Sequence, residues 1–249
     1  MLPELRTRSE DGLDLPYLVW RLPTPCRVVS SAVLGGGIGV RTWLINAQVR
    51  PGYDRLDPAT HLNELAGLAG VVGPGVGLLT AADVDTWQTS IDDGVRVDTT
   101  VGVRVPTWAA SPPGTPDPTY TSDPPGSPGR TVGTINIVAF LPQLLTDGAL
   151  VNLVATATEA KTQALLEAGV PGTGTATDAV CLVVPAVDEG AGDDEVDPFG
   201  GPRSRWGSRL ARAVHASVLA GTRQSLQRMG QPLPDHPHPQ VGDRSGRVR

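Results

Sequence analysis

The chain has 249 residues, of which 39% are hydrophobic and 4% aromatic, and its formal net charge is −6. This length forms one large domain or two small ones, with a core built mainly from valine, leucine, isoleucine and alanine. The negative charge argues against a nucleic-acid partner, because proteins that bind nucleic acids usually present a basic face. No apolar run approaches the roughly 20 residues that a bilayer span needs, so no membrane partner is expected.

The start of the chain lacks the apolar region of a secretion signal, so the cytoplasm is the expected compartment. Cys26 and Cys181 lie in apolar runs and are interpreted as small core residues, not as a disulfide or a nucleophile. The four histidines come without a CxxC or HExxH motif, which predicts that the protein holds no metal. The sequence indicates no oligomeric state.

Most of the predicted elements are strands. Apolar, β-branched runs predict strands at residues 16–22, 26–34, 42–49, 134–141 and 179–186. Residues 76–84 are expected to form a strand or a strand followed by a turn. Asp92-Asp93-Gly94 predicts a hairpin between two further strands. A helix is expected over 57–70 and another from Arg203, with Ser204 near its start, to about Gln227.

The segment between these late strands has the clearest helical signals. Thr146 is a good N-cap and Gly169 suits the position after the helix end. Its alanine-rich apolar face predicts close packing on a sheet. One stripe of the helix carries Asn152, Thr156, Glu159 and Gln163. Because this stripe has only one charge, it favours the wall of a polar pocket over a solvated face.

This order predicts an α+β fold, a layered sandwich with a largely antiparallel sheet and helices packed on it. The late strand–helix–strand unit fits a right-handed parallel crossover. We expect a single domain over residues 1–229. Proline-rich and acidic compositions predict disordered insertions at 111–130 and 188–197, and a disordered tail at 230–249.

Residues 35–39, GGGIG, follow a strand as a dinucleotide-binding loop would, but a second strand comes next, and such a loop needs a helix. A glycine-rich hairpin turn is therefore favoured. The alternative is that Gly35, Gly36 and Gly37 let the backbone approach a bulky ligand closely. Ser30 and Ser31 lack the GxSxG motif of a serine nucleophile.

Residues 172–179, GTGTATDA, concentrate hydroxyl groups and one carboxylate between the helix and a buried strand. Gly172 and Gly174 permit unusual φ angles. Thr175, Thr177 and Asp178 suit the recognition of amides and hydroxyls, and Asp178 is able to orient or activate another group. Lys161, the only lysine, either snorkels or pairs with a carboxylate. Thr134, after Gly133, is either a plain β-former or a hydroxyl nucleophile.

These pieces together resemble the adenosylcobinamide amidohydrolases of corrinoid salvage. The resemblance covers most of the chain outside the three segments expected to be disordered. It is carried by SSAVLGGGI (30–38), LINAQV (44–49), LLTAADV (78–84), DTTVGV (98–103), GTINI (133–137), ALVNLVATATEAKTQALLEAGVPGTGTATDAV (149–180) and FGGPRSRWGSRLARAV (199–214). The stretch 149–180 is the most specific of them.

The resemblance implies hydrolysis of the aminopropanol amide of adenosylcobinamide to adenosylcobyric acid, with a corrinoid as the small-molecule partner. It implies no protein-held cofactor, because the cobalt belongs to the substrate. The residues expected to bind the substrate are Ser31, Gly35, Gly36, Gly37, Asn46, Asn152, Thr156, Thr175 and Thr177. The alternative function is a non-catalytic corrinoid-binding or carrier protein.

A second resemblance concerns mechanism. Gly133-Thr134, an apolar strand, an alanine-rich helix and a small-residue loop with an acid are similar to the self-processing β-peptidyl aminopeptidases, which have an αββα-type fold. The resemblance implies that Thr134 attacks the amide carbon. Asn136 or a backbone N–H would stabilise the oxyanion, while Thr175 and Asp178 would assist proton movement.

Chain cleavage before Thr134 is left open by this resemblance. Without cleavage, Thr134 needs an external base, either Glu159 or Asp178. The other route has Glu159 or Asp178 activate water with no covalent intermediate. Both routes require Thr134, Glu159 and Asp178 to share one cleft.

Overall fold

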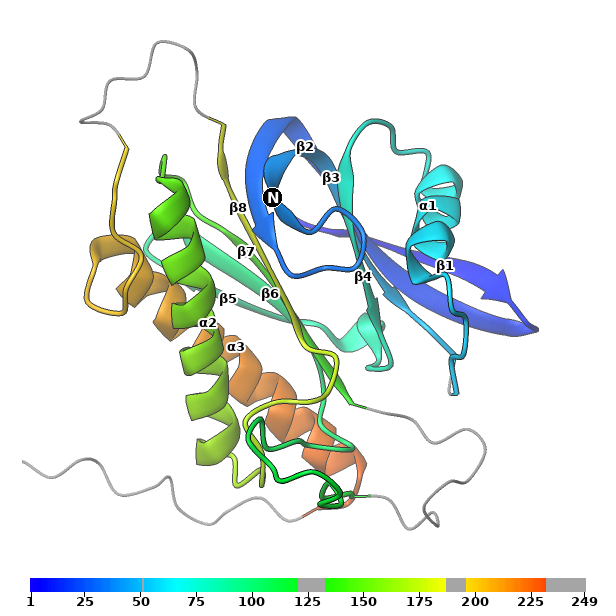
Figure 1. Ribbon diagram of the computed structural model, residues 1–249. Helices are drawn as coiled ribbons and strands as arrows, with labels where there is room; N and C mark the ends of the chain where they lie inside the picture. The colour runs from blue at the N-terminus through cyan, green and yellow to red at the C-terminus, as the bar shows by residue number, and fades with distance from the viewer. Residues whose placement is uncertain (51, 121–132, 187–195, 232–249) are drawn as a thin grey trace, which may run out of the picture.

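The computed structural model describes residues 1–50, 52–120, 133–186 and 196–231 (Figure 1). Strands dominate the first half of the chain and long helices the second. The elements in chain order are β1 (Glu4–Glu10), β2 (Leu13–Ser30), β3 (Gly37–Gln48), α1 (Pro58–Ala69), β4 (Gly75–Thr80), a short 3-10 helix η1 (Val84–Thr86), β5 (Gln88–Asp92), β6 (Val95–Gly102), β7 (Thr134–Phe140), α2 (Asp147–Glu167), β8 (Ala179–Pro185) and α3 (Arg205–Arg228).

The strands form one sheet in the order β4-β3-β2-β8-β7-β6-β5, and β1 pairs with β2 beside this path. Among the described strands, β3 with β4 and β7 with β8 are parallel pairs, and the other pairs are antiparallel. The predicted antiparallel character is therefore confirmed. So is the parallel pairing of the two strands that flank α2.

The long strand β2 is irregular, and the strands on its two sides share one core. Its register against β3 shifts between Arg21 and Cys26, and only the part from Cys26 onward pairs with β8. Such an irregularity bends a strand. As a result, apolar side chains of β2, β3 and β4, such as Trp20 and Leu44, pack in one core with Val138 and Cys181 of β7 and β8.

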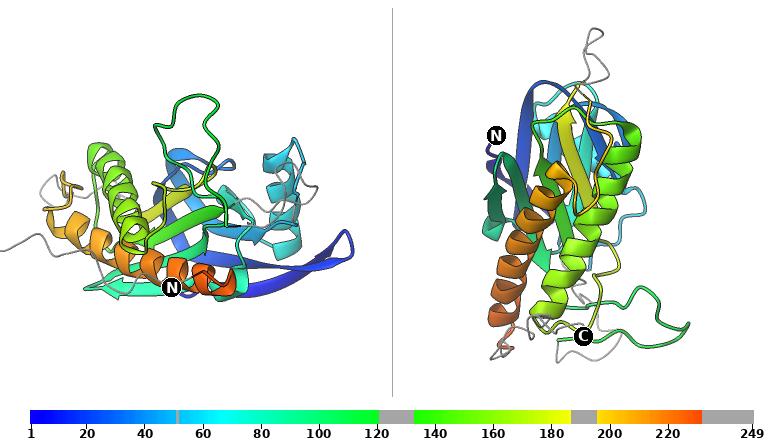
Figure 2. Two further views of the ribbon diagram at one scale, coloured as in Figure 1. Left: turned by 90° about the horizontal axis from the view of Figure 1, so that it is seen from below. Right: turned by 90° about the vertical axis from the view of Figure 1, so that its left-hand side faces the viewer.

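Helices cover the outer faces of the two halves. A second core joins the alanine-rich face of α2 and the apolar face of α3 to β6, β7, β8 and Val29 of β2. A third core joins α1 to β2 and β3. The views in Figures 1 and 2 show α1 on the side of the molecule opposite α2 and α3. This layered arrangement confirms the predicted α+β sandwich with helices packed on the sheet.

Local signals at the long helices are confirmed as well. Thr146 accepts a hydrogen bond from the backbone N–H of Ala149, and Gly169 has φ +76° just after α2. Ser204 accepts in the same way from the N–H of Gly207 at the start of α3. None of the described helices combines the length and the apolar character that a membrane crossing requires.

The structure differs from the sequence predictions near the N-terminus. β1, ELRTRSE, was not predicted because it has no apolar face, which an edge strand does not need. The strand expected over 26–34 ends at Ser30 and gives way to a turn. At 76–84 the strand-plus-turn alternative is confirmed, because β4 ends at Thr80 and is followed by a bend and η1.

The predicted disordered segments fall mostly outside the described residues, in 121–130, 188–195 and 232–249. Residues 111–120 form neither helix nor strand and are mainly exposed. Asp197, placed in the acidic insertion by the sequence, instead forms a β-bridge with Leu145.

The two cysteines provide a test of this core. Burial raises the pKa of the Cys181 thiol to about 12 and also raises that of the less buried Cys26. At pH 8 the Cys181 thiol is therefore almost wholly protonated and inaccessible. Folded protein should consume at most one equivalent of a thiol reagent, and protein in concentrated urea two. Rapid reaction of two equivalents with folded protein would contradict this core.

Candidate active site

A cavity of about 510 Å³ opens where the two halves of the sheet meet. We call it the Thr134 cavity. It lies at the end of β4, the start of β7, the loop before β8 and the loop before α1. Its walls are formed by Ser31, Ala32, Val33, Val49, Arg50, Gly52, Tyr53, Pro58, Leu78, Leu79, Thr80, Ala81, Thr134, Asn136, Thr177, Asp178 and Ala179.

Thr134, the first residue of β7, is 3% exposed, and its Oγ1 lies 2.8 Å from Oγ1 of Thr177. The Thr177 hydroxyl also lies 3.4 Å from the carbonyl oxygen of Gly133. Gly133 must be a glycine here, because an added Cβ would lie 2.4 Å from the carbonyl oxygen of Gly102. One hydroxyl thus contacts both the candidate nucleophile and the carbonyl of the preceding residue.

Asp178 accepts four hydrogen bonds. Its Oδ1 accepts from the backbone N–H of Ile135 at 2.9 Å and from the Thr175 hydroxyl at 2.5 Å. Its Oδ2 accepts from the Thr175 N–H at 3.0 Å and from Nζ of Lys161 at 2.5 Å. The side chains of Lys161 and Asp178 are only 9% and 12% exposed. Lys161 therefore pairs with a carboxylate, which is one of the two alternatives that the sequence predicted for it.

Gly174 makes room for this ion pair. A Cβ at that position would lie 2.4 Å from Oδ2 of Asp178 and 2.5 Å from Nζ of Lys161. The predicted unusual φ angles are wrong, because neither Gly172 nor Gly174 has a positive φ. Lack of a side chain, not backbone conformation, explains these glycines.

Asn136 and Asn46 join the two halves of the sheet. The Asn136 amide donates to Oδ1 of Asn46 and to the carbonyl oxygen of Leu79, both at 2.9 Å. Asn46 in turn donates to the Thr100 hydroxyl at 2.9 Å. Oδ1 of Asn136 is buried without a partner. Asn136 borders the cavity, whereas Asn46 is behind it and does not form its wall.

Of the residues predicted near the glycine-rich turn, only Ser31 borders the cavity, and its hydroxyl accepts from the N–H of Val180. Gly35 and Gly36 belong to the turn between β2 and β3, Gly37 is the first residue of β3, and none of the three is among the cavity residues. Gly35 and Gly37 have φ angles of +71° and +82°. The favoured interpretation as a hairpin turn is therefore confirmed.

The polar stripe of α2 does not reach the Thr134 cavity. Asn152 and Glu159 are exposed, and Thr156 is buried by donating to the carbonyl oxygen of Gly200. Thr156 and Glu159 border a different hollow, shared with Arg212 and His215 of α3. The expected convergence of Glu159 with Thr134 and Asp178 is wrong, because the apolar face of α2 occupies the side toward the sheet. The few charges of the stripe reflect its position beside α3.

Sequence reasoning missed Arg50 and Tyr53 in the cavity wall, which come from a loop without periodicity. It named Lys161 without identifying its partner, although a sole lysine next to a predicted polar loop was a usable signal. In the part of the chain that the structure describes, no three His, Cys, Asp or Glu residues gather in a metal-binding cluster.

Comparisons with known proteins identify the family of this chain. The profile of the adenosylcobinamide amidohydrolase family matches residues 2–230, so the chain belongs to that family and is a hydrolase that acts on an amide. The adenosylcobinamide amidohydrolase of Methanosarcina mazei is 28% identical over 194 residues, which is 77% of this chain and 88% of that protein. The protein of the same name from Halobacterium salinarum is 40% identical over 104 residues, or 41% of this chain and 40% of that protein.

A β-aminopeptidase from Burkholderia sp. is similar among solved structures, with 14% identity, a TM-score of 0.34 and 93% of each chain covered.

The four hydrogen bonds of Asp178 predict a large structural effect of its removal. Asp178→Asn leaves the buried Lys161 charge without a counter-ion, so the free energy of unfolding should fall by about 3 kcal/mol. Glu159→Gln, on the exposed side of α2, should change it by less than about 0.5 kcal/mol. Urea unfolding followed by circular dichroism measures both. Equal effects of the two substitutions would contradict the structural role of Asp178.

Proposed function

We propose that the chain hydrolyses the amide between aminopropanol and the corrin of adenosylcobinamide. Water is consumed, the amide C–N bond breaks, and aminopropanol and adenosylcobyric acid leave. One observation carries the proposal: the buried hydroxyl of Thr134 borders a cavity together with Thr177 and Asp178, in a chain that belongs to this family. The alternative function, a corrinoid carrier, would not require the buried pair of Thr134 and Thr177 hydroxyls in the cavity.

The cavity suits a substrate with neutral amides. Most of its walls are apolar or carry uncharged polar groups, and Arg50 and Asp178 are the ionisable side chains besides Tyr53. Asp178 is paired with Lys161, and Arg50 with Asp11 and Asp54. An unpaired side-chain charge in the cavity would oppose binding, because a bound macrocycle would bury it. Since both side-chain charges have partners, a substrate fringed with amides avoids this cost.

In the proposed reaction, Oγ1 of Thr134 attacks the amide carbon, and its proton passes to a base. The C–N bond then breaks, the amine leaves with a proton, and water hydrolyses the Thr134 ester. Asp178 is assigned a positioning role and not that of the base, because all four of its contacts are with donors other than Thr134. Glu159 is not assigned a role because it lies outside the cavity.

The base is proposed to be the α-amino group of Thr134, freed by cleavage of the Gly133–Thr134 bond. Among the described residues, the side chain that contacts Oγ1 of Thr134 is Thr177, which is itself no base. The Thr177 hydroxyl also contacts the Gly133 carbonyl, the group that Thr134 would attack during cleavage. In that step Oγ1 of Thr134 bonds to the Gly133 carbonyl carbon, the Gly133–Thr134 amide bond breaks, and the hydroxyl proton goes to the nitrogen. Water then hydrolyses the ester between Gly133 and Thr134.

Substitution of the hydroxyl tests the nucleophile. Thr134→Ala should lower the release of aminopropanol from adenosylcobinamide by more than about 100-fold, because it removes the attacking oxygen. Thr134→Ser should retain measurable turnover. Thr158→Ala, a matched control on the exposed side of α2, should behave like the wild type. Chromatography of both products is the measurement. Wild-type turnover by Thr134→Ala would exclude this nucleophile, and corrinoid binding without release by the wild type would favour a carrier.

Intact mass spectrometry tests the base. The active protein should contain two fragments, residues 1–133 and 134–249, whereas Thr134→Ala should remain a single chain. A fully active preparation made of uncleaved chains would overturn the assignment of the α-amino group, while leaving the nucleophile to be judged by its own substitution.

A further inference from the structure

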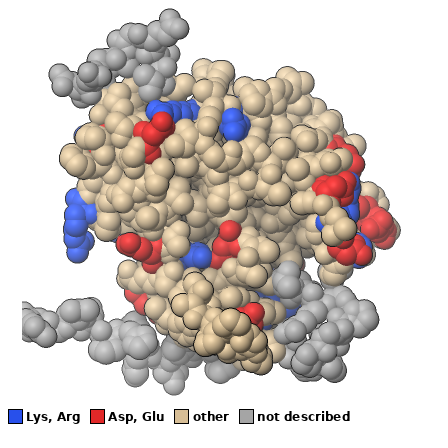
Figure 3. Space-filling model, viewed as in Figure 1, with Lys and Arg blue, Asp and Glu red and all other residues tan. Residues whose placement is uncertain are grey.

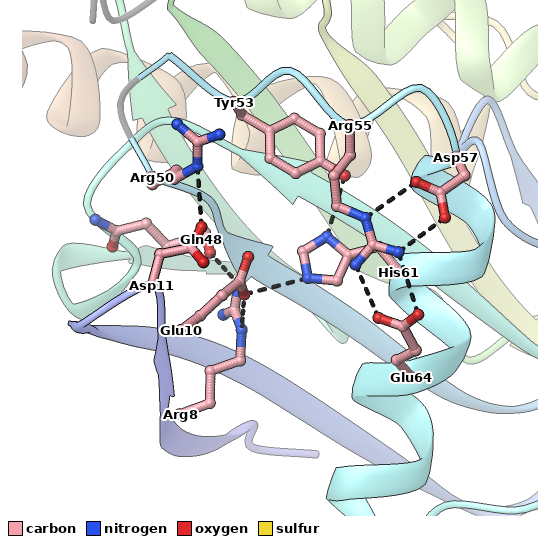
Figure 4. A network of polar contacts seen from close by, with 10 residues as sticks. All are labelled: Arg8, Glu10, Asp11, Gln48, Arg50, Tyr53, Arg55, Asp57, His61 and Glu64. Atoms are coloured by element: carbon pink, nitrogen blue, oxygen red, sulfur yellow. Dashed lines mark hydrogen bonds and ion pairs between the residues drawn. The ribbon is translucent and has the colours of Figure 1, made fainter.

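Tyr53 borders the Thr134 cavity and contacts a buried histidine, His61 (Figure 4). The two rings stack with centroids 5.6 Å apart and planes at 21°. The Tyr53 hydroxyl also lies 3.0 Å from Nδ1 of His61. His61 is on α1 and is 2% exposed. One face of the tyrosine ring and its hydroxyl are thus both occupied by the same histidine.

The contacts continue to the N-terminal hairpin. Nε2 of His61 lies 3.2 Å from a carboxylate oxygen of Glu10, which also accepts from Arg8 at 2.7 Å. Arg8 additionally donates to the carbonyl oxygen of Gln48. A carboxylate only accepts, so we assign the His61 proton to Nε2, and Nδ1 accepts from Tyr53. Burial raises the pKa of the Tyr53 phenol, which keeps that proton available at neutral pH.

We propose that Tyr53 is a specificity-determining residue that packs its free ring surface on the flat apolar face of a corrinoid, and that His61 is the positioning residue that fixes this ring. The inference rests on the proposed function. Tyr53 is the aromatic side chain among the cavity residues, and the others are aliphatic, small and polar or, at Arg50 and Asp178, charged. Aromatic rings gain from stacking on planar conjugated surfaces beyond the area they bury.

The fixed position of Tyr53 is what makes it effective. Its loop has no helix or strand of its own, so an untethered side chain would lose freedom on binding. Here that ordering is already present in the free protein, through His61 and through the ion pairs of neighbouring Arg50 with Asp11 and Asp54. The β1–β2 hairpin, which supplies Arg8, Glu10 and Asp11, is thereby part of the binding site.

Binding of the product adenosylcobyric acid by isothermal titration calorimetry tests the proposal without depending on turnover. Tyr53→Leu removes the ring and should weaken binding about 10-fold. Tyr53→Phe keeps the ring but loses the tether, and should weaken it about 3-fold. KM for adenosylcobinamide should rise in parallel, with kcat within about twofold of the wild type. Glu64→Gln, on the same helix as His61, alters an exposed ion pair with Arg55 and should leave both constants unchanged.

A double substitution separates positioning from general structural damage. His61→Leu should weaken product binding in the wild type but add nothing in the Tyr53→Leu background, because His61 acts through the ring. The proposal would be overturned if Tyr53→Leu bound the product as tightly as the wild type does. It would also be overturned if His61→Leu weakened product binding equally in the wild type and in the Tyr53→Leu background. If His61→Leu does not fold, Tyr53→Phe alone tests the tether. Absence of hydrolysis by the wild type would instead refute the proposed function, and leave the binding measurement valid.

Discussion

The position of the Asp178 carboxylate determines how the candidate active site is built. It connects α2 through Lys161, the loop before β8 through Thr175 and the start of β7 through the N–H of Ile135. A carboxylate this buried is stable only with such partners, so the three segments cannot shift independently. The parallel register places Asn136 opposite Ala179. Thr177 lies in the turn just before β8, and its hydroxyl contacts that of Thr134, the first residue of β7.

The amide contacts between Asn136 and Asn46 impose a second constraint, since they fix the distance between the two halves of the sheet at the cavity. Both N–H groups of the Asn136 amide are already donated, and its oxygen has no partner. A carbonyl oxygen repels a developing negative charge. In the proposed reaction, oxyanion stabilisation is therefore assigned to backbone N–H groups, the second of the two options that the sequence left open.

The sequence predicted those parts of the site that follow from local signals and from one supersecondary unit. Thr146 and Gly169 mark the ends of α2 chemically, and parallel strands on both sides of one helix bring Thr134, Thr177 and Asp178 together. The prediction that Glu159 lies in the cleft was wrong because helical periodicity shows which residues share a face of a helix, but not what that face packs against. Tyr53 and His61 are linked only through the tertiary packing of a loop, a helix and an edge hairpin, for which a single sequence offers no periodic signal.

The distribution of charge bears on what happens after the proposed bond cleavage. Hydrolysis turns a neutral amide into a carboxylate, and a free cation in the cavity would then hold the product. Both side-chain charges of the cavity are already neutralised by partners, Asp178 by Lys161 and Arg50 by Asp11 and Asp54. On the face drawn in Figure 3, charged groups gather mainly at the edge over α1, and much of the rest is uncharged. A cavity of this kind binds through shape and neutral polar groups, so the new carboxylate gains more from water than from the cavity walls, which favours its release.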